Sequence, residues 1–185
     1  ILFHVLPHMD PVYTISIIPT GMGAAGYTMP LPDNDEMFNT KNKMLEDITT
    51  LLGGRVAEEI IFGDITTGAS NDIKRATETA RSMVMKYGMS EKIGLIAYGN
   101  DDDEVFIGRD LAHTRGYSEE VAREIDGEIS RIIRECHENA ESIIRENIGV
   151  LHSCAALLLE KEKIHREEFE ALFTTEKEEV AKTNE

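Results

Sequence analysis

The longest run of regular apolar spacing extends over residues 118–148 and sets the fold class. Apolar side chains recur there every three or four residues, the spacing that places them along one face of an α-helix. The stripe consists of Val121, Ile125, Ile129, Ile132, Ile133, Cys136, Ala140, Ile143 and Ile144. Such a face needs other helices to cover it. The segment therefore predicts a mainly α-helical fold with a long helix near its C-terminal end.

Two helices are predicted upstream of this segment, over residues 41–62 and 71–87. Both show apolar residues at helical spacing and are followed by a glycine that can end a helix. Gly53 and Gly54 lie inside the first, although each costs roughly 1 kcal/mol relative to alanine in a helix. We therefore expect close packing at this pair.

Downstream of the long helix, a further helix is predicted over residues 150–161 and a short one over 166–173. A short connection near Gly149 separates the helix over 150–161 from the long one. This spacing predicts a C-terminal hairpin of two antiparallel long helices. Residues 1–173 are expected to form one domain, and residues 174–185 are expected to be a disordered tail.

One small β-hairpin is predicted near the N-terminus. Residues 12–19 alternate and are rich in β-branched side chains, which indicates a strand. A glycine-rich turn precedes a returning strand, and Pro30 and Pro32 restrict that strand to the edge of a sheet. Such an edge can pair with an extended peptide. The alternative is an ordinary hairpin that a neighbouring subunit covers. The candidate edge residues are Ala24, Ala25, Gly26, Tyr27, Thr28 and Met29.

The charge balance excludes some classes of partner. The chain carries 19 basic and 35 acidic residues, a formal charge of −16. A nucleic-acid-binding domain needs a basic face, so no nucleic-acid partner is expected. Docking to an anionic membrane surface is disfavoured for the same reason. Two cysteines cannot form a disulfide framework or a four-thiolate zinc site.

Three groups of side chains are candidates for metal chemistry, each with a simpler interpretation. Asp72 is either a carboxylate ligand or a first-turn residue that complements the helix dipole. His4 and His8 have zinc-ligand spacing, but Pro7 ends the helix between them, which favours a surface pair. The acidic residues 101–104 lack the spacing of a calcium loop and are expected to be a solvated tip.

The sequence resembles the peptidase domain of the FtsH family, which comprises membrane-anchored, ATP-dependent zinc metalloproteases. The resemblance covers residues 1–173. It rests on three segments, DPVYTISIIPTG, LLGGRVAEEIIFGDITTGASNDIKRATETARSMVMKYGMSEKIG and EVFIGRD. The TTGASND portion with its following helix is the most specific part. The resemblance implies a helical FtsH-type peptidase domain with zinc as its metal.

The resemblance also implies roles for particular residues. The family's HEAGH motif supplies two zinc histidines and the general-base glutamate, and it lies immediately before the segment that matches residues 1–3. No catalytic residue is therefore expected within these 185 residues, and the polypeptide alone is expected to be inactive. Asp72 matches the family's third zinc ligand, and Glu58 is expected to orient groups near the metal.

For the parent protein, the resemblance implies unfolded or membrane-protein substrates and a homo-hexamer built from ATPase and peptidase rings. ATP and magnesium would act only through the ATPase domain, which we expect upstream of residue 1. The parent is expected to be anchored in a bacterial inner membrane with this domain, itself soluble, facing the cytoplasm. The alternative is a non-catalytic, protease-like domain that assembles rings or holds client proteins.

Overall fold

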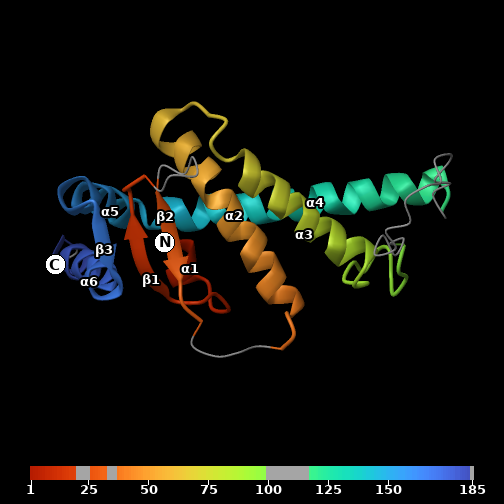
Figure 1. Ribbon diagram of the computed structural model, residues 1–185, viewed down its shortest axis with the longest axis horizontal. Helices are drawn as coiled ribbons and strands as arrows, with labels where there is room; N and C mark the ends of the chain where they lie inside the picture. The colour runs from red at the N-terminus through yellow and green to blue at the C-terminus, as the bar shows by residue number, and fades with distance from the viewer. Residues whose placement is uncertain (20–25, 33–36, 99–116, 184–185) are drawn as a thin grey trace.

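A computed structural model describes residues 1–19, 26–32, 37–98 and 117–183, with side chains to residue 174. Figure 1 shows a long helical body with a small sheet at one end. The elements follow the order α1 (Leu2–Val5), β1 (Val12–Ser16), β2 (Tyr27–Pro30), α2 (Lys41–Phe62), α3 (Ser70–Met85), α4 (Glu119–Glu146), α5 (Ile148–Lys161), β3 (Lys163–His165) and α6 (Arg166–Thr183). The expected mainly α class with one small sheet is confirmed.

The main core lies where α2 and α3 pack against α4 (Figure 1). The stripe predicted on α4 is buried there, with Ile125, Ile132 and Cys136 each at most 5% exposed. Ile48 from α2 and Met83 from α3 meet this stripe and are fully buried. The three helices therefore form a rigid frame that fixes α2 and α3 relative to each other.

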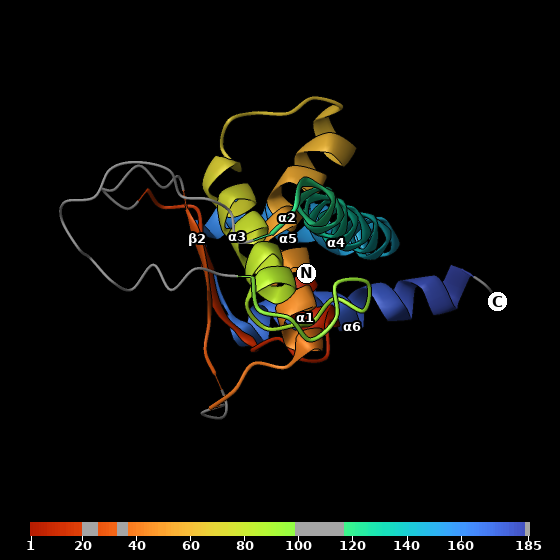
Figure 2. The ribbon, with the colours of Figure 1, turned by 90° about the vertical axis from the view of Figure 1, so that its right-hand side faces the viewer.

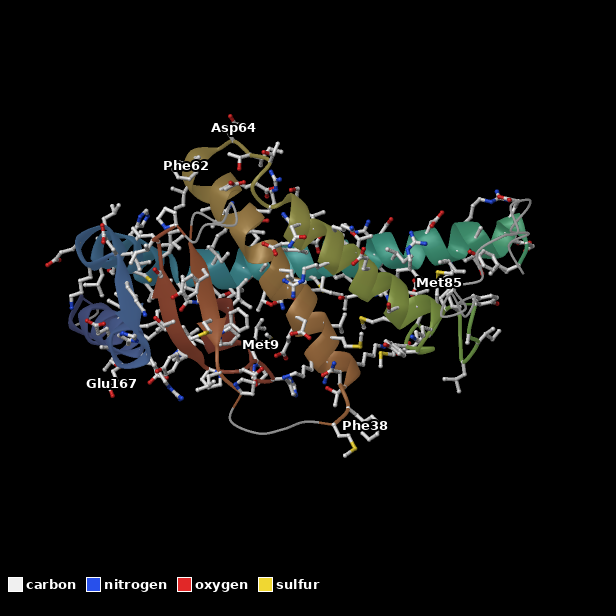
Figure 3. The ribbon with its side chains drawn as sticks, viewed as in Figure 1. Met9, Phe38, Phe62, Asp64, Met85 and Glu167 are labelled. Carbon is white, nitrogen blue, oxygen red and sulfur yellow. The ribbon has the colours of Figure 1, made fainter. Side chains whose placement is uncertain are left out.

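Local signals set the bounds of α2. The Thr40 hydroxyl accepts a hydrogen bond from the Lys43 amide at 3.2 Å, which caps the first turn. At the other end Gly63 has a left-handed backbone, with a φ of 62°, and ends the helix as expected. Figure 3 shows Phe62 and Asp64 beside this glycine at the outer tip of the α2–α3 connection.

The two C-terminal helices are present, but their arrangement corrects the expected antiparallel hairpin. The chain bends by 75° between α4 and α5. Asn147 lies at this corner, and its amide group donates to the Ile143 carbonyl at 2.8 Å. Because α5 turns away from α4, it packs its buried residues in a second core with β1, β3 and α6.

The sheet has three antiparallel strands in the order β2-β1-β3. Strand β3 was not expected from the sequence, which offered only three residues of strand pattern. Its Ile164 is fully buried and pairs with Ile15 of β1. With β1 in the centre, β2 lies at the edge of the sheet, as the sequence predicts.

Helix α6 extends beyond the expected domain end. It continues to Thr183, so the backbone of residues 174–183, expected to be part of a disordered tail, is helical. Figure 2 shows the end of this helix leading away from the body toward the C-terminus. The domain boundary at residue 173 stays a prediction. Over the described ranges, no single helix has both the length and the apolar composition of a membrane span. Among these residues, only the bent pair of α4 and α5, taken together, meets both criteria.

Candidate metal and peptide site

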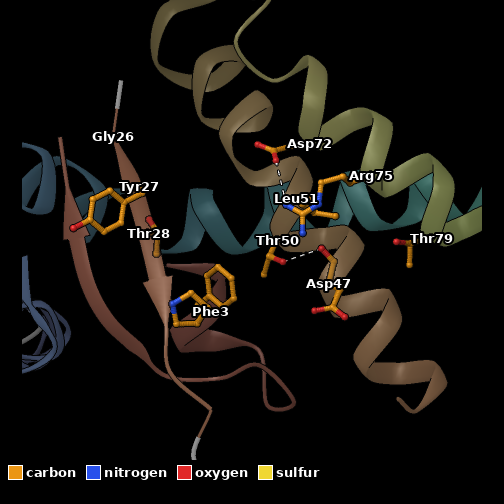
Figure 4. A pocket seen from close by; sticks show the side chains of 11 residues that line it. Phe3, Gly26, Tyr27, Thr28, Asp47, Thr50, Leu51, Asp72, Arg75 and Thr79 are labelled. Carbon is orange, nitrogen blue, oxygen red and sulfur yellow. Dashed lines mark hydrogen bonds and ion pairs between the residues drawn. The ribbon is translucent and has the colours of Figure 1, made fainter. Parts of the chain in front are cut away.

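A cavity of about 640 Å³ lies between strand β2 and helices α2 and α3 (Figure 4). Its wall combines two features that the sequence analysis treated separately, the candidate metal ligand Asp72 and the candidate edge strand. The lining residues are Phe3, Gly26, Tyr27, Thr28, Pro30, Asp47, Thr50, Leu51, Asp72, Arg75 and Thr79. The fold therefore brings Asp72 and the strand to one site.

Asp72 lies in the first turn of α3 and presents its carboxylate to the cavity (Figure 4). Its side chain is 47% exposed. Its ion-pair partner is Arg75, one turn further along the helix, with Nη1 3.8 Å from Oδ1. This separation and exposure make the pair weak. Asp72 can therefore turn a carboxylate oxygen toward a ligand at little energetic cost.

Glu58 lies on α2 and binds the loop that leads into α3. Its Oε1 accepts a hydrogen bond from the Thr66 hydroxyl at 2.6 Å, and its Oε2 accepts from the Thr66 amide at 3.2 Å. These two hydrogen bonds lower the pKa of Glu58. The Thr66 hydroxyl oxygen also accepts from the Gly68 amide at 3.1 Å. Glu58 thus fixes the loop a few residues before Asp72.

Arg55 contributes to the same arrangement from the preceding turn of α2. Its Nη2 donates to the Thr66 carbonyl at 2.8 Å, and its Nη1 lies 3.8 Å from Glu58 Oε2. Hydrogen bonds to both the main-chain amide and the main-chain carbonyl of Thr66 therefore hold the loop. The structure shows that Glu58 holds the loop through Thr66, whereas the role expected for it near a metal stays a prediction.

The edge strand β2 pairs with β1 through Thr28 opposite Ile15 and Tyr27 opposite Ser16. Within residues 1–19, 26–32, 37–98 and 117–183, the other edge of β2 pairs with no strand. Tyr27, Thr28 and Pro30 of the strand line the cavity, together with Gly26 just before it. Ala24 and Ala25, also predicted as edge residues, lie outside the described residues. Met29 is 40% exposed and pairs with Thr14.

Several residues that line this cavity were not predicted from the sequence. Asp47, Thr50 and Leu51 follow the three- and four-residue spacing of one helix face, a signal that could have marked Asp47 as a charge beside apolar neighbours. Phe3 comes from α1, and its position depends on tertiary packing alone. The cavity therefore extends beyond the predicted residues on its α2 and α1 sides.

The described part of the chain does not contain a complete metal site. No group of three or more histidine, cysteine, aspartate or glutamate side chains lies close enough together there to hold a metal. His4 stacks on Phe173 with ring centroids 4.0 Å apart, whereas His8 binds Glu46. Both histidines are exposed, as expected of surface residues, and they contact different partners. The acidic residues 101–104 fall outside the described ranges.

Comparison with known proteins gives one family and several close relatives. The model of peptidase family M41 matches residues 1–172. An ATP-dependent zinc metalloprotease FtsH 1 from Thermoanaerobacter sp. (strain X514) is 54% identical over 171 residues, 92% of this chain and 28% of the relative. The ATP-dependent zinc metalloprotease FtsH of Thermotoga maritima is 48% identical over 176 residues, 95% of this chain and 29% of the relative. The chain thus spans less than a third of the length of these relatives.

Proposed function

Because the chain belongs to peptidase family M41, we propose that it is the proteolytic domain of an ATP-dependent zinc metalloendopeptidase. One observation carries the proposal: Asp72 and the free edge of β2 line the same cavity. A metal ligand beside a peptide-binding edge is the arrangement that metal-assisted peptide hydrolysis requires. The names of the relatives support zinc as the metal.

In this proposal Asp72 is the carboxylate ligand of a zinc ion. Two further ligands come from the histidines of a HEAGH motif upstream of residue 1, together with the general-base glutamate. Three protein ligands leave the fourth zinc position open. When bound, zinc polarises the peptide carbonyl and lowers the pKa of a water molecule. The weak Arg75 pair, 3.8 Å long, leaves the Asp72 carboxylate available for this role.

Strand β2 binds the substrate in this proposal. An extended peptide adds to its open edge and forms main-chain hydrogen bonds, which make little demand on sequence. Such recognition suits a protease of unfolded polypeptides. Because Gly26, Tyr27 and Thr28 line the cavity that contains Asp72, a peptide on this edge passes close to the metal ligand.

Glu58 and Arg55 act in the proposal as positioning residues. They hold the Thr66 hydroxyl, amide and carbonyl and thereby the loop that precedes α3. Groups behind the ligands of a metal commonly change affinity or activity by about 10- to 100-fold when they are removed.

The complete protein extends the proposal. ATP and magnesium bind an ATPase domain, six copies assemble into rings, and a membrane anchor holds the proteolytic domain on the cytoplasmic side of a bacterial inner membrane. Its substrates are unfolded or membrane proteins. The relatives, described as ATP-dependent and more than three times the length of the chain, support this organisation. In the alternative, the domain assembles rings or holds clients without hydrolysis, which fits the single metal ligand of the described residues.

The test uses the full-length protein and casein as substrate. We expect Asp72→Ala to lower ATP-dependent hydrolysis by at least about 100-fold, because a zinc ligand is lost. Asp126→Ala removes an exposed acid from α4 and serves as the control with unchanged activity. A full-length protein that assembles but never hydrolyses casein, or an Asp72→Ala variant as active as the control, would support the non-catalytic alternative.

A further inference from the structure

The cavity contains a second carboxylate, that of Asp47, which has no part in the proposed metal site. Asp47 lies on α2, and Figure 4 shows it at the end of the cavity opposite Asp72. Its side chain is half-buried. The Thr50 hydroxyl donates a hydrogen bond to the Asp47 main-chain carbonyl at 2.8 Å and not to the Asp47 carboxylate.

Across the described ranges, no hydrogen bond or ion pair neutralises the Asp47 carboxylate. Burial is the main cause that raises its pKa. The two nearby cations contact other groups. Lys43 donates to the His8 carbonyl at 3.2 Å, and Arg75 pairs with Asp72 at 3.8 Å. A half-buried carboxylate without a partner is destabilising, and a cation in the cavity would relieve that cost.

The cavity has the shape and lining for a long side chain. Leu51 on α2 and Phe3 on α1 provide apolar walls, and Asp47 provides the single carboxylate that remains unpaired (Figure 4). Successive side chains of an extended peptide point to opposite faces. Alternate residues of a peptide on β2 therefore face α2 and can enter the cavity. Lysine and arginine combine an apolar stem with a cationic end, which matches this lining.

We propose that Asp47 is a specificity-determining residue, which binds the cationic group of a lysine or arginine side chain of a peptide held along β2. The proposal rests on the peptide path of the proposed function. It adds a side-chain preference to a main-chain recognition that has none. Arg75 offers the opposite preference, for acidic side chains, but it has a weak ion-pair partner in Asp72, whereas the Asp47 carboxylate has none among the described residues.

The experiment measures the affinity of peptides for the full-length protein by fluorescence anisotropy. The peptides are extended, labelled and uncharged, and one lysine is moved through each position in turn, with norleucine as its apolar equivalent. We expect lysine to lower Kd by about tenfold at one position, the gain of a partly desolvated charge pair. Glutamate at that position should raise Kd.

Variants then assign the preference to Asp47. Asp47→Asn should abolish the advantage of lysine, and Asp47→Glu should retain most of it. Asp126→Asn makes the same change in net charge on the exposed face of α4 and should leave the preference intact. Equal Kd values for lysine and norleucine at every position, or a lysine preference that survives Asp47→Asn, would overturn the proposal. A preference for glutamate would assign the cavity to Arg75 instead.

Hydrolysis of the same peptides separates this inference from the proposed function. Cleavage of the peptides without a lysine preference would overturn the role of Asp47 and support the proposed protease function. A lysine preference in binding without any cleavage would support the role of Asp47 and overturn the proposed protease function. Binding of none of the peptides overturns both.

Discussion

Glu128 is the buried carboxylate of the described core. It is 6% exposed and accepts a hydrogen bond from the Ser90 hydroxyl at 2.6 Å. Arg131 donates to both of its oxygens, at 3.0 and 3.1 Å. These hydrogen bonds from Arg131 are the main cause that lowers the pKa of Glu128. The group joins α4 to the segment after α3 and contributes to stability only while it is ionised.

We therefore expect Glu128→Gln to lower the free energy of unfolding by about 1–3 kcal/mol at pH 7. A lowered pKa means that the contribution is fully present above the ordinary carboxyl range and is lost as pH falls through the folded-state pKa. The loss in the free energy of unfolding caused by Glu128→Gln should therefore be smaller at pH 3 than at pH 7. Urea unfolding at pH 7 and pH 3 measures it, with Glu141→Gln, in a more exposed Arg–Glu pair of the same helix, as control. A deficit that does not change with pH would contradict this assignment.

The Glu58–Thr66 contact gives a second prediction at the scale of residues. Glu58→Ala and Thr66→Val each remove the same hydroxyl–carboxylate bond, 2.6 Å long. Both should speed amide hydrogen exchange at Gly68, and Thr66→Val should do so more, because it also removes the oxygen that accepts from the Gly68 amide. Adding Glu58→Ala to Thr66→Val should then speed exchange by less than Glu58→Ala does alone, because the two changes share one contact. Independent, additive effects would show that the loop is held by other means.

At the scale of elements, α1 packs directly on α2 at a glycine. A Cβ atom on Gly53 would lie 2.5 Å from Leu2 Cδ1, and Leu2 is only 6% exposed. At the neighbouring Gly54 a Cβ atom would meet nothing within 4 Å. The close packing expected from the sequence is thus present at the first glycine and absent at the second.

This pair provides a matched test. Gly53→Ala should lower the free energy of unfolding by about 1–2 kcal/mol through overpacking. Gly54→Ala should raise it by about 0.5–1 kcal/mol through helix propensity. Urea denaturation of the two variants measures the difference in sign. Two variants of equal stability would mean that α1 is not seated on α2 as described.

The elements also show what the sequence could predict. Helix α2 has the expected bounds, because its spacing, its cap at Thr40 and its end at Gly63 are all local signals. The 75° corner at Asn147 and the strand β3 were missed, because both depend on contacts with distant segments. The site divides in the same way. Asp72 and the edge strand could be recognised from motifs, whereas their shared cavity could not.

At the scale of the whole molecule, the frame of α2, α3 and α4 does most to place the site. It fixes α3, and with it Asp72, against α2, and the sheet beside α2 presents its open edge to the same cavity. The relatives cover the same segment as part of a much longer chain. In the proposed function, the domain is therefore the part of a larger protease that provides one metal ligand and receives the peptide.

The proposed function requires Asp72 to bind zinc in the full-length protein. The most direct measurement is the zinc content of the purified full-length protein by elemental analysis, for the natural sequence and for Asp72→Ala, with intact mass and folding checked in parallel. We predict about one zinc per chain for the natural sequence and a small fraction of that for the variant. Equal zinc contents in the two proteins, or a natural protein without zinc, would contradict the account.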